Sequence, residues 1–252
     1  MPDSANSSTF DNLARWWRET RASHGRLSSL ALLAALTREF LRDSLPSHRR
    51  QRYGDVDYDW DHRVDTTSAT VNWRDRLLGL LNSPYQPTDP ALFQEMLSSL
   101  NLDFRDFTFI DIGSGKGRTL LMASDYPFRR IVGVELLPEL HRVAQDNIAK
   151  YKPDSQRCLV IESLCGDARE FVFPPEPTVL YLFNPLPEAG LIQLLTNLEQ
   201  SLQEHPRPVF VIYPNPVLER VLAERTWLQK IGSTHQYGLY ATLSPQGPPF
   251  PR

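Results

Sequence analysis

Cysteine is scarce in this chain of 252 residues, which contains only Cys158 and Cys165. Six residues separate the two, a spacing that matches neither a zinc-binding pair nor a redox C-x-x-C motif. The composition therefore excludes a disulfide-rich secreted scaffold, and we expect two free thiols in a reducing compartment.

Long apolar segments are missing as well. The longest uncharged apolar run covers residues 27–37, far short of the roughly 20 residues that a membrane-spanning helix needs. The first residues contain no apolar stretch of the kind that a secretory leader carries. We therefore expect a cytoplasmic protein without a membrane span.

An excess of basic charge is also absent. The net charge is −3 and the isoelectric point is near 6.1, so no domain-wide surface for nucleic acid is predicted. Only residues 1–52 are basic, with nine Arg against five Asp and Glu. This part either contacts an acidic partner or presents a solvated helix surface, and the sequence leaves its role and the oligomeric state open.

After residue 106 the chain shows a regular succession of short apolar runs and helical patterns. Before it, residues 1–52 have helical spacing, residues 53–90 look irregular and residues 91–100 look helical. The expected strands are 107–112, 131–136, 157–162, 178–184, 208–214, 226–233 and 237–243, and the expected helices are 116–125, a segment that starts at Pro138, 187–204 and 215–225.

This alternation predicts an α/β fold with a doubly wound, mostly parallel seven-stranded sheet and helices on both faces. The last two strands have no helix between them, so we expect them to form an antiparallel hairpin at one edge. We divide the chain into a helical extension (1–52), a connector (53–100), the core (101–245) and a flexible tail (246–252).

The sharpest motif is DIGSGKG, which runs from Asp111 to Gly117 between an apolar strand and a helix. Glycines in such a turn allow positive φ angles and a close approach of the backbone to a ligand. The helix that follows offers free N–H groups at its start. The turn lies beyond the carboxyl end of a strand, where open α/β sheets bind their ligands.

The spacing of these glycines argues against two common ligands. A dinucleotide fingerprint needs G-x-G-x-x-G, but Arg118 occupies the third glycine position. No G-x-x-x-x-G-K-[ST] phosphate loop occurs either. A nicotinamide oxidoreductase is therefore a weak alternative.

The stretch FIDIGSGKGR resembles motif I of the class I S-adenosylmethionine-dependent methyltransferases, an acidic residue followed by x-G-x-G-x-G. Three further elements follow in that family's order: Glu135 at the end of the second strand, Cys165-Gly166-Asp167-Ala168 after the third, and Asn184-Pro185 at the end of the fourth. The resemblance covers residues 101–243 and implies S-adenosylmethionine as the cofactor.

In this family the acid at the position of Glu135 binds both ribose hydroxyls, as a carboxylate that accepts two hydrogen bonds can. The acid at the position of Asp167 contacts the adenine amino group. The resemblance implies a cofactor-binding set of Asp111, Gly113, Ser114, Gly115, Gly117, Glu135, Leu136, Asp167, Ala168, Asn184, Tyr85 and Thr88. The residues themselves give no metal site, so we expect none.

The connector carries a narrower resemblance, through DHRVDTT at 61–67 and Tyr85-Gln86-Pro87-Thr88, together with KGR in motif I and FNP before residue 186. These stretches are similar to a group of largely uncharacterised bacterial methyltransferases, and distantly to non-SET protein-lysine methyltransferases. By that analogy Tyr85 and Thr88 line the methionine end of the cofactor. The alternative is a rigid connector made by its prolines.

The resemblance to the class I methyltransferases also implies that Asn184 and Pro185 position the methyl acceptor. Our first hypothesis is an amine acceptor such as a protein lysine. The aromatic residue that often ends N-P-P-[YF] is missing here, because Pro187 stands in its place. A methyltransferase for a small metabolite and a catalytically silent, cofactor-binding scaffold stay open as alternatives.

The connector also alternates acidic and aromatic residues around Tyr58, Asp59 and Trp60. They either present an acidic, aromatic face to a cationic substrate or form a solvated loop whose aromatic rings pack inward.

Overall fold

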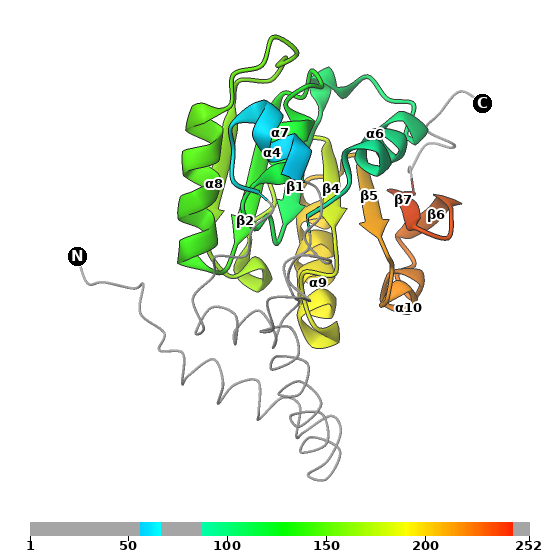
Figure 1. Ribbon diagram of the computed structural model, residues 1–252. Helices are drawn as coiled ribbons and strands as arrows, with labels where there is room; N and C mark the ends of the chain where they lie inside the picture. Colours follow the sequence, from blue (N-terminus) through cyan, green and yellow to red (C-terminus); the bar gives the residue numbers. More distant parts are fainter. Residues whose placement is uncertain (1–55, 67–86, 244–252) are drawn as a thin grey trace. The chain divides into compact units, whose positions relative to one another are not determined.

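The structure is a computed structural model that describes residues 56–66 and 87–243 (Figure 1). Residues 57–66 and the segment from Pro87 onward belong to one compact unit. The helical extension expected for 1–52, the tail expected for 246–252 and the site residue Tyr85 lie outside the described residues.

A seven-stranded sheet in the order β3-β2-β1-β4-β5-β7-β6 forms the centre of this unit. β1 lies in the middle of the five parallel strands, so the chain winds outward to one side through β2 and β3 and to the other through β4 and β5. The strands are β1 (Thr108–Ile112), β2 (Arg130–Glu135), β3 (Ile161–Cys165), β4 (Thr178–Leu182), β5 (Val209–Pro214), β6 (Leu228–Ser233) and β7 (Tyr237–Thr242).

The first five strands are parallel, and β7 runs antiparallel between β5 and β6. The predicted fold class and the edge hairpin of the last two strands are therefore confirmed. All residues of β1, β4 and β5 are buried, which explains why their sequences are mostly apolar.

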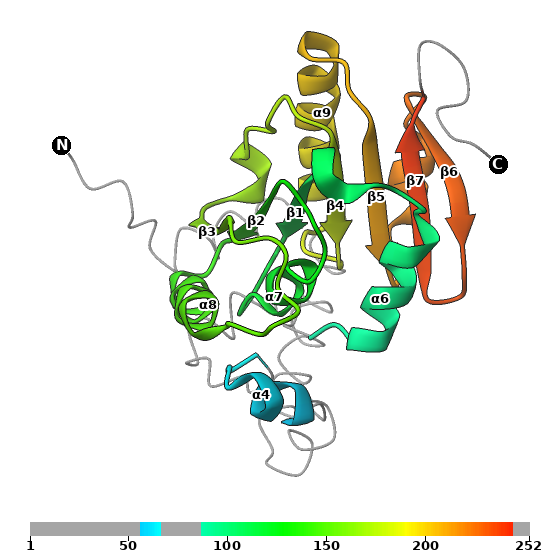
Figure 2. The same cartoon turned by 90° about the horizontal axis from the view of Figure 1, so that it is seen from above.

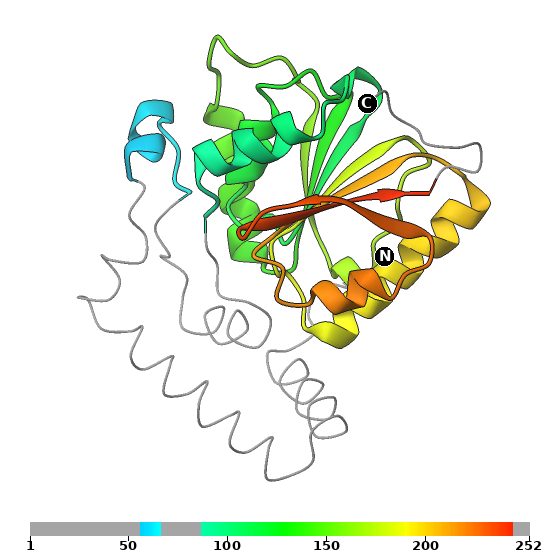
Figure 3. The same cartoon turned by 90° about the vertical axis from the view of Figure 1, so that its right-hand side faces the viewer.

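Helices cover both faces of the sheet (Figures 2 and 3). One face carries α6 (Pro90–Ser99), α7 (Arg118–Ala123) and α8 (Pro138–Lys150), and the other carries α9 (Glu188–Glu204) and α10 (Glu219–Ala223). Side chains of β1 alternate between the two cores, with Phe109 in one and Ile110 and Ile112 in the other. Two short 3₁₀ turns, η1 (Phe104–Asp106) and η2 (Ala168–Glu170), lie in the connections.

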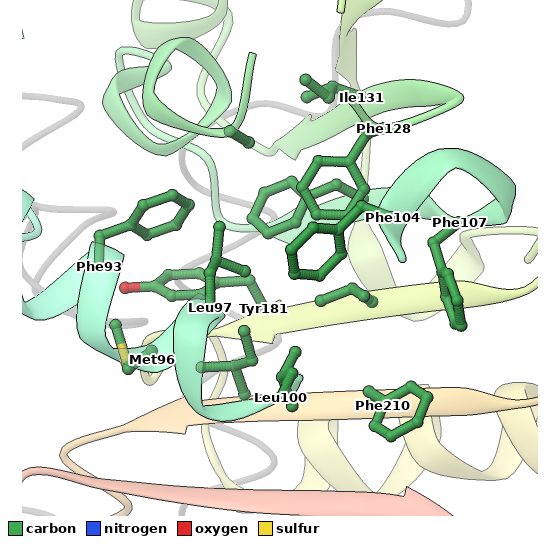
Figure 4. Close-up of a cluster of buried hydrophobic side chains, with 14 of the residues drawn as sticks. Phe93, Met96, Leu97, Leu100, Phe104, Phe107, Phe128, Ile131, Tyr181 and Phe210 are labelled. Atoms are coloured by element: carbon green, nitrogen blue, oxygen red, sulfur yellow. The ribbon is translucent and has the colours of Figure 1, made fainter. Parts of the chain in front are cut away.

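Helix α6 supplies much of the first core (Figure 4). It begins at Pro90, and the Asp89 side chain caps it by accepting the N–H of Leu92. Its Phe93 ring lies 5.8 Å from the ring of Tyr181 on β4, measured between centroids. The residues just before the sheet are thus packed on the strand whose end carries Asn184.

Three elements differ from the sequence expectation, and one of them is the helix expected at 215–225, which covers only Glu219–Ala223 as α10. β3 covers 161–165 rather than 157–162, because its register with β2 runs from Ile131–Ile161 to Glu135–Cys165. It is an edge strand with no buried residue, so its polarity does not mark it as a strand. The region expected to be irregular contains helix α4 (Val56–His62). No helix in the described part of the chain is long and apolar enough to cross a membrane.

Candidate functional site

The glycine loop lies at the carboxyl end of β1, where the strand order reverses. Gly113, Gly115 and Gly117 all have left-handed φ angles, of 79°, 55° and 84°. The N–H groups of Gly113 and Ser114 both donate to the carbonyl of Val134, at 2.8 and 3.1 Å. The loop is therefore bound to the end of β2 before it turns into α7.

Close packing makes two of these glycines necessary. A Cβ atom at Gly113 would lie 2.7 Å from Cβ of Pro185, which follows β4. A Cβ atom at Gly117 would lie 3.2 Å from Cβ of Ala144 on α8. The alternating glycines thus let the loop contact the end of β4 on one side and α8 on the other.

Glu135, at the end of β2, holds the loop with its carboxylate. Oε2 accepts the N–H of Gly115 and Oε1 accepts the N–H of Leu137, each at 2.8 Å. Burial raises the pKa of Glu135, and the backbone N–H bonds from Leu137 and Gly115 act in the opposite direction. Each oxygen has a second lone pair, so the carboxylate can still accept two hydroxyl groups.

Asp111, in β1, is a buried carboxyl group one strand away from Glu135. Burial raises its pKa to about 7, a hydrogen bond from Thr119 opposes this shift, and the charge of Glu135 adds to it. Two buried acids with raised pKa values therefore lie at the glycine loop, a pattern common at functional sites.

Open space lies beyond the ends of β2 and β3. The side chain of Leu136 is 37% exposed although it follows a buried residue. A Cβ atom added to Gly166 would meet nothing within 4 Å. Asp167 borders this space, where it caps η2 and pairs with Arg169 at 2.5 Å, and Ala168 after it is buried.

Asn184 marks the end of β4 and also has a left-handed backbone, with φ of 46°. Its amide is held at both ends. Nδ2 donates to the carbonyl of Asn215 at 2.7 Å, and Oδ1 accepts the hydroxyl of Tyr213 at 2.8 Å. Pro185 follows directly and contacts Gly113, as described above.

Thr88 enters the site from the segment before α6. It is buried, and its hydroxyl forms a 2.7 Å hydrogen bond with the hydroxyl of Tyr181 on β4. The pKa of Tyr181 is raised by burial and by the charge of Asp111. Tyr181 lies opposite Asp111 in the register of β1 and β4, so Thr88 contacts the side chain next to the acid that begins the glycine motif.

The structure brings together most of the residues that the sequence singled out, at the carboxyl ends of four adjacent strands. The side chain of Ser114 points instead toward β2, where its hydroxyl lies 2.6 Å from the position that a Cβ atom at Gly133 would take. That buried hydroxyl has no hydrogen-bond partner among the described residues.

Sequence reasoning missed the supporting residues Tyr181, Tyr213 and Asn147. Asn147 is buried in α8, where its Nδ2 donates to the carbonyl of Lys116 at 3.0 Å. Its polarity inside an apolar helical stripe was a usable signal. The two tyrosines gave none, because aromatic residues are ordinary in buried strands.

Comparisons with known proteins add a set of distant structural likenesses. No protein-family model matches the chain, and no curated protein matches its sequence. The RNA methyltransferase from Salinibacter ruber in complex with S-adenosyl-L-homocysteine is 20% identical with a TM-score of 0.38, over 65% of this chain and 97% of that one.

The ribosomal protein L11 methylase from Lactobacillus delbrueckii subsp. bulgaricus is 19% identical with a TM-score of 0.44, over 64% of this chain and 89% of that one. The precorrin-6y C5,15-methyltransferase from Geobacter metallireducens is 14% identical with a TM-score of 0.45, over 64% and 92%. All three are methyltransferases, the class that the sequence resembles. The fold itself is established by the strand order and register, independently of these likenesses.

Proposed function

We propose that this chain is an S-adenosylmethionine-dependent methyltransferase that acts on an amine. One observation carries the proposal: the glycine loop after β1 is held by Glu135 from β2 and packs against Pro185 from β4. Three strand ends thus converge on one loop at the point where the strand order reverses, which is where a nucleoside ligand binds in such sheets.

The residues around this loop fit the cofactor's nucleoside half. The Glu135 carboxylate keeps lone pairs for the two ribose hydroxyls. Leu136 offers an exposed apolar side chain beside it, and Gly166 leaves open space at the end of β3. Asp167 and Ala168 border that space, so the adenine would lie there.

The opposite half of the site fits the amino-acid part of the cofactor. β1 and β4 lie on the far side of β2 from β3, so a ligand with its adenine at β3 and its ribose at β2 extends toward them. Asp111, Thr88 and Asn184 come from this half. Buried carboxyl and hydroxyl groups there suit an ammonium group.

When bound, S-adenosylmethionine supplies a methyl group that its sulfonium charge already activates. The protein must then orient a neutral nucleophile and exclude water. Oδ1 of Asn184 has a second lone pair beside the one that Tyr213 occupies. It can accept an N–H of an incoming amine and direct the nitrogen lone pair toward the methyl group. This feature supports an amine over an alcohol, which would need a general base.

Calorimetry with S-adenosylmethionine, S-adenosylhomocysteine and NAD tests the cofactor. We expect micromolar binding of the first two, on the order of −8 kcal/mol, and no binding of NAD. Glu135→Ala should remove the binding. An absence of binding to both sulfur ligands would overturn the proposal.

Transfer of a labelled methyl group tests the acceptor. Lysine-containing peptides and proteins should become labelled, and the label should survive the base treatment that cleaves methyl esters. Labelling of only small metabolites would replace the amine-on-protein hypothesis with the metabolite alternative. Cofactor binding without any transfer would favour the silent scaffold.

A further inference from the structure

Arg118 is the first residue of α7, directly after the glycine loop, and only 2% of its side chain is exposed. Its Nε donates to Oγ1 of Thr66 at 2.8 Å, and its Nη1 donates to the carbonyl of Thr88 at 3.4 Å. Its Nη2 lies 3.5 Å from Oδ1 of Asp59. The guanidinium also lies over the Tyr58 ring, 4.6 Å from its centroid.

These contacts join two stretches that precede the core. Tyr58, Asp59 and Thr66 belong to residues 57–66, while Thr88 begins the stretch that leads into α6. The Thr66 hydroxyl also donates to the Asp59 carboxylate, so two of the three acceptors of Arg118 are joined to each other. One planar guanidinium therefore fixes the main chain at position 88 relative to residues 57–66.

A second set of bonds keeps residues 57–66 in place from the other side. Asn147 of α8 forms two hydrogen bonds with the backbone of Asp65, of 2.9 and 2.8 Å. Lys116, which is 1% exposed, pairs with the Asp65 carboxylate at 2.7 Å. Residues 57–66, which supply two acceptors to Arg118, are thus bound to α8 and to the glycine loop.

From Thr88 the connection continues into the proposed cofactor site. The Thr88 hydroxyl forms a hydrogen bond with the Tyr181 hydroxyl, and Tyr181 lies opposite Asp111 in the register of β1 and β4. The contact of Arg118 with Thr88 leads to Tyr181 on β4, whereas the residues proposed to hold ribose and adenine follow β2 and β3. Its influence should therefore reach the β1 and β4 side and leave the β2 and β3 side unchanged.

We propose that Arg118 is a positioning residue for the amino-acid end of the cofactor, acting through Thr88 and Tyr181. This inference rests on the proposed function. A buried charged network of this kind contributes little net stability compared with apolar packing, so its geometry is the property that matters. Arg118, which stands where a dinucleotide fingerprint has its third glycine, would then have a positioning role.

The test compares two ligands that differ only in the amino-acid part: S-adenosylhomocysteine, which carries it, and 5′-methylthioadenosine, which does not. Calorimetry on the full chain gives both affinities for the wild type and for Arg118→Lys, which keeps the charge and loses the planar fork. We expect S-adenosylhomocysteine to bind about tenfold more weakly to the variant, and 5′-methylthioadenosine to change less than about twofold.

Thr66→Val provides an independent variant of nearly unchanged shape, in case Arg118→Lys does not fold. It removes the acceptor of Nε at a position outside the proposed site, and it should weaken S-adenosylhomocysteine alone by about threefold. Arg105→Gln is the matched control, since Arg105 pairs with Asp103 on the surface and is 75% exposed. It should leave both affinities unchanged.

The outcomes separate this inference from the function on which it rests. Equal weakening of both ligands in the Arg118 and Thr66 variants would mean a general structural role and would overturn the inference, as would no weakening at all. Wild-type protein that binds neither ligand would overturn the proposed function, and the inference with it. Selective loss of S-adenosylhomocysteine supports both.

Discussion

Pro185 lies so close to Gly113 that a Cβ atom at position 113 would come within 2.7 Å of the Pro185 Cβ. The two residues follow β1 and β4, which are neighbours in the sheet. Their contact fixes the glycine loop relative to Asn184. The loop that would hold the cofactor and the residue that would orient the acceptor are therefore one packed unit.

Gly113→Ala should destabilise the protein for two reasons, because the new methyl group clashes with Pro185 and because φ is 79°. We expect the free energy of unfolding to fall by about 2–4 kcal/mol in urea denaturation. Gly166→Ala is the matched control, since its methyl group meets nothing within 4 Å. It should change stability by less than about 0.5 kcal/mol. Equal effects of the two variants would contradict this account of the loop.

Glu135→Gln should weaken cofactor binding strongly. The amide turns one acceptor into a donor, which would then face the N–H of Gly115 or of Leu137. We expect a loss of at least about tenfold in affinity for S-adenosylhomocysteine by calorimetry. Glu162→Gln, the same change at an exposed position of β3, should bind like the wild type. Unchanged affinity in Glu135→Gln would remove Glu135 from the site.

The buried carboxyl group of Asp111 should make stability depend on pH. Its pKa is raised to about 7 in the folded protein, so the folded state keeps a proton that the unfolded state releases near pH 4. The stability that protonated Asp111 contributes at low pH is therefore lost as pH rises from about 4 to about 7. Above about pH 7 the free energy of unfolding no longer changes through this group.

Asp111→Asn removes this titration. Relative to wild type, the variant should gain about 2–3 kcal/mol of stability between pH 5 and pH 8, measured by denaturation at both values. Its amide can still accept the hydrogen bond from Thr119. A stability difference that is the same at pH 5 and pH 8 would show that Asp111 is ionised throughout.

Substitutions at Asn184 should separate its backbone from its side chain. Asn184→Ala loses two hydrogen bonds and retains a Cβ atom at φ of 46°, whereas Asn184→Gly loses the same bonds without that strain. We expect Asn184→Gly to be more stable than Asn184→Ala by about 1 kcal/mol, although it removes more atoms. The reverse order in thermal unfolding would mean that the left-handed conformation is not maintained.

The sequence predicted the strands best where burial is complete. β1, β4 and β5 are buried on both faces, so each consists mostly of apolar residues, with Asp111 as the charged exception in β1. β3 was displaced because an edge strand carries polar residues, while exposed apolar residues such as Leu159 lie just before it. Helix α4 was missed because it has only seven residues and its aromatic side chains contact residues that are distant in the sequence. The ring of His62 stacks between those of Tyr58 and Tyr151, 4.3 and 5.3 Å away.

The sequence predicted which strand ends form the site, but not the hydrogen bonds that connect its side chains. The partners of Asn184 lie about thirty residues away, and only the pairing of β4 with β5 brings them together. Of the two interpretations of the acidic, aromatic stretch, inward packing holds for Tyr58 and Asp59, which contact Arg118. Trp60 is 83% exposed. The domain boundaries and the cytoplasmic location stay predictions.

Because Lys116 is buried, chemical labelling of its amine can report local opening of the structure around the glycine loop. The chain has four lysines, and the other three (Lys150, Lys152 and Lys230) are exposed. An amine-reactive reagent would modify those at once but would reach Lys116 only when Asp65 withdraws. The labelling rate of this one amine, read by mass spectrometry, would time how often the segment before the core separates from the glycine loop.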